Sequence, residues 1–446
     1  MSLLRRALDG VSGVGLRSLT LVTDLLPPRV RFGHWNTLLR QLAFADGLPS
    51  VDPGEQLWES APAPVHASQT DLSCLIVAGA LDTGGVETVV ATLAEGLPAH
   101  GIAAEVACSD EGRISQWLRD RGVRVTRVPT EELAGFVDAR QPDAIQLHRI
   151  DRNMLTALMP VAPRTIPVFH AMESYLDEAT WSALGAFARA SAACIAVSPS
   201  VADFYAARIT TTADIVVNGV ASPIGDLNAR HENERRRLAA AIGVPFAADD
   251  IVVVALQRFS DQKNAAGLVD AFLLAAASDS RLRLVMAGAP SSWLEVRRAD
   301  ILRKTHPAGR RVHFLGDSDP AALLVGGDMF ALDSFAEGGP VSAVEAVACG
   351  LPVVLSDVGF ARELVAAAAV PGRVVRRAND TLTQASYAAE RRRRHQSNRE
   401  EFAAALLELA DTEPRQASGA PDRFTLPTMV ASHARALRVA AEAAGR

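Results

Sequence analysis

Short apolar runs alternate with longer amphipathic runs from residue 74 onward. The first series of apolar runs is CLIVAGA (74–80), AEVACS (104–109), AIQLHRI (144–150), TIPVFHA (165–171) and ACIAVSPS (193–200). Between the first two lies GVETVVATLAEGLPAHG (85–101), which has helical spacing and ends in glycine. Continuous apolar runs separated by helices predict parallel strands buried on both faces.

A second series with the same alternation begins near residue 251. Its apolar runs are IVVVALQRF (251–259), RLRLVMAGA (281–289), VHFLG (312–316), DMFALD (328–333) and PVVLSD (352–357), and its helical runs include NAAGLVDAFLLAAAS (264–278) and PVSAVEAVACG (340–350). Two series predict two doubly wound α/β domains, the first over 71–224 and the second over 225–415, with a linker near VVNGVASPIGD (216–226). Residues 416–446 predict a terminal helix that can pack on either domain.

Residues 1–70 form an N-terminal extension outside this alternation. Leucines 3, 4 and 8 and Val11 have helical spacing, FGHWNTLLRQLAFA (32–45) follows, and SAPAPVHASQT (60–70) predicts a loop. One hypothesis is a packing arm, and the other is an interfacial amphipathic segment with arginines 5, 6 and 17 facing lipid headgroups. We favour packing, because glycines 10, 13 and 15 interrupt any single long helix.

Composition is that of a globular chain of 446 residues, with 49% hydrophobic and 22% charged residues. The net charge of −6 gives no field that would attract nucleic acid. The basic run ERRRRHQSNREE (390–401) is bracketed by acids and predicts a solvated helix face. No apolar window is long enough to span a membrane and no cleavage site follows the first residues, so we expect a cytoplasmic protein, with peripheral attachment to the inner face of the membrane as the alternative.

The four cysteines are scattered through apolar segments without a Cys-x-x-Cys pair or a nearby histidine cluster. This pattern favours a reduced compartment and argues against a structural zinc site. We expect no metal and no cofactor.

The stretch SFAEGGPVSAVEAVACGLP (334–352) contains the first candidate site. Pro340 suits the first helical position and Gly350 the left-handed position after the last, so a short helix over about 340–349 is expected. Glu337 precedes this helix and Glu345 lies on it. A carboxylate on each side of a helix start suits a ligand that has hydroxyl groups, although a solvated loop acid and a helix-surface acid are an equal alternative on spacing alone.

Backbone amides at the start of this helix add to the candidate site. Gly338 and Gly339 allow a ligand to approach the backbone closely, and Pro340 and Val341 follow at the positive end of the helix dipole. An anionic part of a ligand is expected there.

The second candidate site is LQRFSDQKN (256–264), where a strand ends and the next helix begins. Cations are disfavoured at a helix N-terminus, so Arg258 and Lys263 suit a bound anion such as a phosphate. The alternative is a surface lysine and an arginine paired with a local acid, for which Asp261 is the candidate.

Two weaker candidates follow strands of the first series. Gly84 and Gly85 begin a helix in AGALDTGGVETV (78–89), but the spacing is neither a dinucleotide fingerprint nor a Walker motif. His170 and His148 each follow an apolar run, where ligand-facing residues belong, although a lone histidine is more often a hydrogen-bonded core residue.

These segments, in this order, resemble glycosyltransferase family 4, the retaining enzymes of GT-B fold (glycosyl transferases group 1), over about residues 71–365. The resemblance rests on residues 79–101, VFHAMESY (168–175), CIAVSPSVADFY (194–205), VVNGV (216–220), LQRFSDQKN and above all residues 312–359 with its two glutamates. It implies two Rossmann-like domains facing a central cleft and sugar transfer from a nucleotide-diphosphate sugar, without a metal ion.

The resemblance also implies roles for individual residues. Arg258 and Lys263 would neutralise the donor diphosphate, and Glu345 would bind the nucleotide ribose. Glu337 would position the donor sugar together with Gly338, Gly339, Pro340 and Val341, Gly84 and Gly85 would approach donor and acceptor, and His170 would bond to the donor sugar.

Three features depart from the family or leave the function open. Gly339-Pro340 replaces the usual segment before the helix, residues 366–384 lack the family's acidic glycine-rich loop, and the extension has no counterpart. The acceptor stays unidentified: a cell-envelope glycan, a lipid-linked glycan or a small molecule. A sugar-nucleotide epimerase of the same fold and a catalytically silent sugar-nucleotide-binding scaffold are the alternatives, while a secreted sugar receptor is disfavoured by the lack of a signal.

Overall fold

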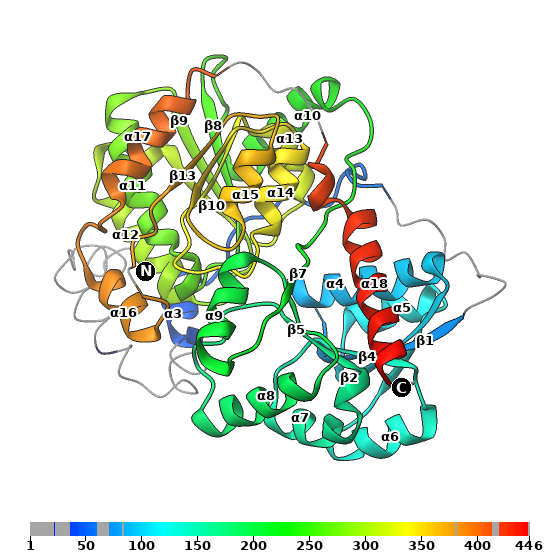
Figure 1. Cartoon of the computed structure of the whole chain (residues 1–446). Helices are drawn as coiled ribbons and strands as arrows, with labels where there is room; N and C mark the ends of the chain where they lie inside the picture. The colour runs from blue at the N-terminus through cyan, green and yellow to red at the C-terminus, as the bar shows by residue number, and fades with distance from the viewer. Residues whose placement is uncertain are drawn as a thin grey trace. The chain divides into compact units, whose positions relative to one another are not determined.

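Figure 1 shows the computed structural model, which describes residue 22 and residues 36–59, 71–82, 84–379, 381–412 and 419–444. The chain divides into two compact units. The N-terminal unit comprises residues 59–221, 337–341 and 422–446, and the C-terminal unit comprises the described residues up to 58 together with 222–336 and 342–421.

The N-terminal unit is built on a parallel sheet of seven strands in the order β3-β2-β1-β4-β5-β6-β7. Its strands are β1 (Leu72–Leu81), β2 (Ile102–Glu111), β3 (Arg124–Arg127), β4 (Ala144–Leu147), β5 (Thr165–Phe169), β6 (Ile195–Ala196) and β7 (Asp214–Ile215). Its helices are α4 (Gly85–Gly96), α5 (Arg113–Asp120), α6 (Leu133–Arg140), α7 (Arg152–Leu158), α8 (Glu178–Ala190), α9 (Pro199–Ile209) and the terminal α18 (Leu426–Ala444).

The C-terminal unit repeats this arrangement with six parallel strands in the order β10-β9-β8-β11-β12-β13. Its strands are β8 (Ile251–Leu256), β9 (Leu282–Ala287), β10 (Val312–Leu315), β11 (Met329–Leu332), β12 (Val353–Ser356) and β13 (Gly372–Val375). Its helices are α3 (Asn36–Ala43), α10 (Leu227–Ile242), α11 (Ala265–Ser278), α12 (Trp293–Lys304), α13 (Pro320–Gly326), α14 (Val341–Ala348), α15 (Ala361–Ala367), α16 (Gln384–Arg392) and α17 (Arg399–Leu409).

The prediction of two doubly wound parallel sheets is confirmed. The central strands are buried almost completely, as their continuous apolar runs require. The expected short helix over 340–349 is α14, and Gly350 after it has a φ of 81°, the left-handed conformation that glycine adopts without strain. The strands missing from the prediction are β3, β7 and β13, which are short; β7 is exposed, and the other two are partly exposed.

The terminal helix α18 packs on the N-terminal unit, against β4, β5 and the turns beside them. It crosses back over the sheet of this unit after the chain has completed the other one (Figure 1). Side chains of α18 therefore belong to the interior of the N-terminal unit.

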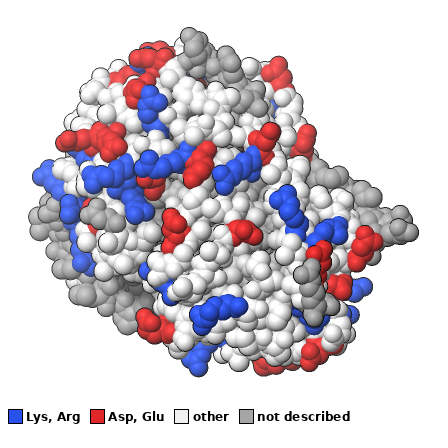
Figure 2. Space-filling model, viewed as in Figure 1, with Lys and Arg blue, Asp and Glu red and all other residues white. Residues whose placement is uncertain are grey.

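Residues 36–58 of the extension pack on the C-terminal unit. The Asn36 side-chain oxygen accepts a hydrogen bond from the amide of Trp293 at 2.7 Å, and the Pro49 carbonyl accepts one from Gly316 at 2.7 Å. The expected amphipathic stretch around residues 3–11 and the loop at 60–70 lie outside the described residues. No helix in the described part of the chain is long and apolar enough to cross a membrane. Figure 2 shows acidic and basic side chains interspersed over the face in view.

The expectation of a solvated helix face at 390–401 is wrong for Glu390 and Asn398, which are buried, and for Arg391. This side chain is buried and pairs with Glu295 of α12, with Nε 3.1 Å from the carboxylate, and with Asp261 at 3.3 Å. Arg298 approaches the same Glu295 at 2.7 Å. Burial alone would raise the pKa of Glu295, but the two arginines hold it below its usual range. The run thus contains one internal cation whose partners lie far away in sequence.

We predict that Arg391→Met lowers the free energy of unfolding of the C-terminal unit by about 3 kcal/mol or more, because Glu295 and Asp261 lose a buried counter-charge. Arg393→Met is the matched control, since Arg393 is exposed and its pairing with Glu390 contributes less than about 1 kcal/mol. Urea midpoints of the two variants measure the difference. Equal midpoints would contradict the structural role of Arg391.

Candidate functional site

The strand order of the C-terminal sheet reverses between β8 and β11, which are neighbours in space. In open parallel sheets, ligands bind beyond the carboxyl ends of the strands at this point. The loops that follow β8 and β11 contain Arg258 and Lys263 in the first case and Glu337 in the second. The topology therefore places the beginnings of the two candidate loops at the same edge of this sheet.

Two hydrogen bonds, one accepted and one donated by Gln262, hold the two loops together. The amide of Phe335 donates to the Gln262 carbonyl at 2.9 Å, and the Gln262 side chain donates to the Ala336 carbonyl at 2.6 Å. The Phe335 ring stacks on Tyr387 of α16, with ring centroids 5.6 Å apart. These contacts thus hold the beginnings of both loops together.

Asp333, directly after β11, anchors the loop that follows β8. Its carboxylate accepts hydrogen bonds from the side chains of Asn264 at 3.0 Å and Asn398 at 2.9 Å. Asn264 itself has a φ of 49° and accepts a further bond from Gln396 at 2.8 Å. Burial raises the pKa of Asp333 to about 7 in spite of these bonds. Asp333 was not among the residues predicted from the sequence, although an acid directly after a buried strand is a usable signal.

Arg258 and Lys263 both precede Asn264 in the loop that follows β8. Arg258 is exposed, and no described side chain pairs with it. Lys263 ends the 3₁₀ turn Asp261–Lys263. Asp261, proposed as the alternative partner of Arg258, instead pairs with Arg391 at 3.3 Å. The arginine is therefore available to an anion from outside the protein.

Glu345 lies on α14 and is half-buried. Burial raises the pKa of its carboxyl to about 7, and no described residue donates a hydrogen bond to it. Most carboxylates in this setting are paired, because an unpaired buried charge is costly. Glu345 is thus an acceptor whose hydrogen bonds are not supplied by the described protein groups.

Residues 337–341 group with the N-terminal unit. Glu337 is 5% exposed. A Cβ atom on Gly338 would lie 1.7 Å from the His170 carbonyl oxygen, so only glycine fits there. Val341 begins α14, after Gly339 and Pro340.

The N-terminal sheet reverses its strand order between β1 and β4. Gly84 and Gly85 follow β1, and α4 begins at Gly85 without a side-chain cap, so its first amides are open to a ligand. The atoms nearest to a Cβ atom on Gly84 would be those of the Glu87 carboxylate, the first at 2.3 Å, whereas a Cβ atom on Gly85 would meet nothing within 4 Å. The described surroundings thus leave space around Gly85, and the Glu87 side chain lies against Gly84.

His148 and His170 follow β4 and β5, and the structure brings them together. His148 Nδ1 lies 2.8 Å from His170 Nε2. Burial lowers the pKa of His170 to about 4, and burial together with the neighbouring histidines lowers the pKa of His148 well below its usual range, so both rings are neutral near pH 7. Two further members of this cluster, Gln146 and His433, were missed by the sequence analysis.

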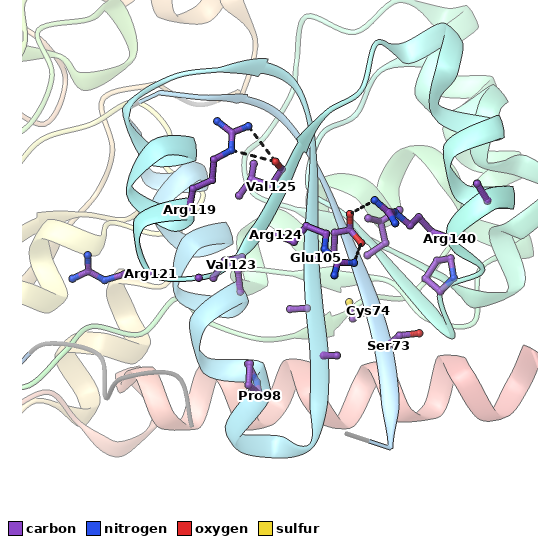
Figure 3. A pocket seen from close by; sticks show the side chains of 17 residues that line it. Ser73, Cys74, Pro98, Glu105, Arg119, Arg121, Val123, Arg124, Val125 and Arg140 are labelled. Atoms are coloured by element: carbon purple, nitrogen blue, oxygen red, sulfur yellow. Dashed lines mark hydrogen bonds and ion pairs between the residues drawn. The ribbon is translucent and has the colours of Figure 1, made fainter. Parts of the chain in front are cut away.

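A cavity of about 890 Å³ lies at the opposite end of the N-terminal sheet, at the amino ends of β1, β2 and β3 (Figure 3). Glu105 in its wall pairs with Arg124 at 3.5 Å and with Arg140 at 3.3 Å. None of the predicted site residues lines it. Its charges are satisfied within the protein, and the candidate chemistry lies at the other end of the strands.

Two family models match the chain in succession. The model described as Glycosyltransferase Family 4 matches residues 83–221, and the model described as Glycosyl transferases group 1 matches residues 242–408. The D-inositol 3-phosphate glycosyltransferase of Mycobacterium tuberculosis is 34% identical over 151 residues, which is 33% of this chain. The match spans 29% of the length of that relative.

Solved structures with the same fold cover both units. Anabaena HepE in complex with UDP has a TM-score of 0.60 at 20% identity, covering 82% of this chain and 100% of the other. A glycosyltransferase from Rickettsia africae has a TM-score of 0.62 at 15% identity, covering 82% and 98%. HepE has also been solved with UDP-glucose, with a TM-score of 0.58 at 19% identity and coverage of 82% and 99%. At these identities the likeness establishes the GT-B fold.

Proposed function

Because the chain belongs to the family 4 glycosyltransferases of group 1, we propose that it transfers a hexose from a nucleotide-diphosphate sugar to an acceptor with retention of the anomeric configuration. The observation that supports this proposal best is the anchored turn after β8, which presents Arg258 and Lys263 beside the loop after β11. Two cations at the strand-order reversal suit a diphosphate.

The proposed donor contacts follow from the chemistry of each group. Arg258 and Lys263 bind the diphosphate, and Glu345 accepts hydrogen bonds from the ribose hydroxyls. Glu337 and the amides near Gly338 hold the donor sugar, and His170 bonds to one of its hydroxyls. The UDP and UDP-glucose bound to HepE make UDP-hexoses the first donors to test.

The proposed reaction depends on charge that develops as the anomeric bond breaks. The leaving nucleoside diphosphate gains negative charge, and cations already held in place stabilise that state more than the bound substrate. Arg258 and Lys263 would supply this positive charge without a metal ion. We propose a glycan, a glycolipid or a small hydroxylated molecule as the acceptor, since the enzyme requires a hydroxyl nucleophile.

We predict that Lys263→Ala and Arg258→Ala each weaken nucleoside diphosphate binding by about tenfold to hundredfold, because each removes a charge-assisted hydrogen bond. Lys304→Ala is the matched control, since Lys304 is the other of the chain's two lysines and pairs with Asp300 at 3.0 Å. Thermal shifts with UDP, GDP, ADP and TDP measure affinity. Wild-type shifts in both site variants would refute the diphosphate assignment.

Turnover distinguishes transfer from the alternatives. Incubation with the sugar nucleotide selected by binding, in the presence of mixed acceptors, should release nucleoside diphosphate and form a glycosylated product. An epimerised sugar nucleotide would instead indicate an epimerase, and binding without any reaction would indicate a scaffold.

We predict that Glu337→Gln spares the affinity for the free nucleoside diphosphate but weakens binding of the sugar nucleotide by about tenfold, because only the sugar loses a hydrogen-bond acceptor. Glu345→Gln should weaken both ligands alike. Isothermal titration of each variant with UDP and the matching sugar nucleotide makes the comparison. Equal losses in the two variants would contradict the separate roles.

We predict that affinity for the sugar nucleotide rises about tenfold between pH 6 and pH 8. Burial raises the pKa of Glu345 to about 7 in the free protein, and hydroxyl donors favour the ionised form, so binding strengthens as pH rises through 7 and levels off above it. The sugar nucleotide itself does not titrate in this range. Glu345→Gln should remove most of this slope while Asp333 still titrates, and an unchanged slope would refute the assignment.

A further inference from the structure

A buried chain of polar side chains leads from His170 to the C-terminal helix within the N-terminal unit. His148 Nδ1 lies 2.8 Å from His170 Nε2, and His148 Nε2 lies 3.1 Å from Gln146 Oε1. Gln146 Nε2 lies 3.0 Å from His433 Nδ1. These three contacts connect β5, β4 and α18 in a single line.

Most of the side chains in this hydrogen-bonded series are buried away from solvent. Gln146 is 0% exposed, His148 is 4% exposed and His433 is 1% exposed. Burial lowers the pKa of His433 to about 3, as it lowers the pKa of His170 to about 4. All three histidine rings are therefore neutral at the pH of the cell.

Because the rings are neutral, the hydrogen bonds of this series all run in one direction from donor to acceptor. A neutral imidazole donates from one ring nitrogen and accepts at the other, so each hydrogen bond fixes the next one. Gln146 accepts at Oε1 and therefore receives the proton of His148 Nε2. His148 Nδ1 is then an acceptor, and the proton between the two rings belongs to His170 Nε2.

The contact at the other end of this hydrogen-bonded series agrees with the same orientation of the Gln146 amide. Its Nε2 donates to His433 Nδ1, which leaves Oε1 for His148. A reversed amide would require His148, His170 and His433 to exchange tautomers together. His433 is supplied by α18, which packs on β4.

We propose that Gln146 and His433 are positioning residues, which act through His148 to hold His170 with its proton on Nε2 and with Nδ1 as a hydrogen-bond acceptor for a hydroxyl of the donor sugar. The role of His170 Nδ1 toward the donor sugar rests on the proposed function. The tautomer of His170 does not, because it follows from the contacts within the N-terminal unit.

Long-range ¹H–¹⁵N spectra of protein labelled with ¹⁵N-histidine, recorded at pH 8 without substrate, test the tautomer directly. His170→Gln assigns the His170 signals. His306 is an internal reference in the same sample, because its Nδ1 accepts the Ala308 amide at 3.1 Å and its proton is therefore on Nε2. We expect the same pattern for His170. A proton on Nδ1, or an average of two tautomers, would overturn the proposal.

Two substitutions of His433 distinguish its proposed role in positioning the Gln146 amide from a role in packing alone. His433→Asn is expected to keep an acceptor near the place of Nδ1, whereas His433→Leu leaves the Gln146 amide without a partner and free to reverse. We expect the leucine variant to show both His170 tautomers and a kcat for the sugar nucleotide about tenfold below wild type, and the asparagine variant to restore most of both.

Each outcome decides between explanations. A lower kcat in His433→Leu with an unchanged His170 spectrum would show a merely structural role and overturn the proposal, as would a wild-type spectrum together with a wild-type rate. If His433→Leu does not fold, the wild-type spectrum alone still decides the tautomer. A protein with the expected spectrum that turns over no sugar nucleotide would refute the proposed function and leave the tautomer assignment standing.

Discussion

The carboxylate of Asp333 is the group on which the geometry of the C-terminal site depends. It is buried directly after β11 and receives the side-chain amides of Asn264 and Asn398. A buried carboxylate without hydrogen bonds is costly, so the bond from Asn264 to Asp333 offsets the strain of the left-handed conformation of Asn264. The turn that presents Lys263 is in this way fixed by the strand that precedes Glu337.

The same constraint operates with neutral groups in the N-terminal unit. His148 is buried after β4 and must satisfy two ring nitrogens, which it does with His170 and Gln146. Because burial removes the charged form, each ring keeps one donor and one acceptor, and the hydrogen bonds acquire a direction. In the C-terminal unit Asp333 fixes Asn264, which is next to Lys263. In the N-terminal unit Gln146 fixes His148, which contacts His170. In each unit the residue proposed to bind substrate is thus a neighbour of a buried polar residue that another polar group holds.

Sequence alone predicted the local part of this architecture. Apolar runs between glycines and prolines predicted the central strands, and Pro340 and Gly350 predicted α14, because these signals act within a few residues. Arg391 was assigned to solvent because its neighbours are charged, whereas its partner Glu295 lies 96 residues away. His433 bonds to Gln146 across 287 residues, and no local pattern distinguishes it from other residues of an amphipathic helix. What the sequence could not predict is which polar residues meet in the interior.

Arginine and lysine have different roles in this chain: arginines pair with carboxylates of the protein, and Lys263 is proposed to bind the phosphate of the substrate. Of the 45 basic residues other than histidine, Lys263 and Lys304 are the lysines, and Lys304 shares Asp300 with Arg297 and Arg303. Arginine suits fixed carboxylates because its planar group forms several bonds in one geometry. Lysine is a point charge on a flexible stem, so it can follow a phosphate whose position and charge change as a bond breaks. Arginine pairs with most of the buried carboxylates in the described part of this chain, so Lys263 is the cation in this site that is best suited to a phosphate that moves.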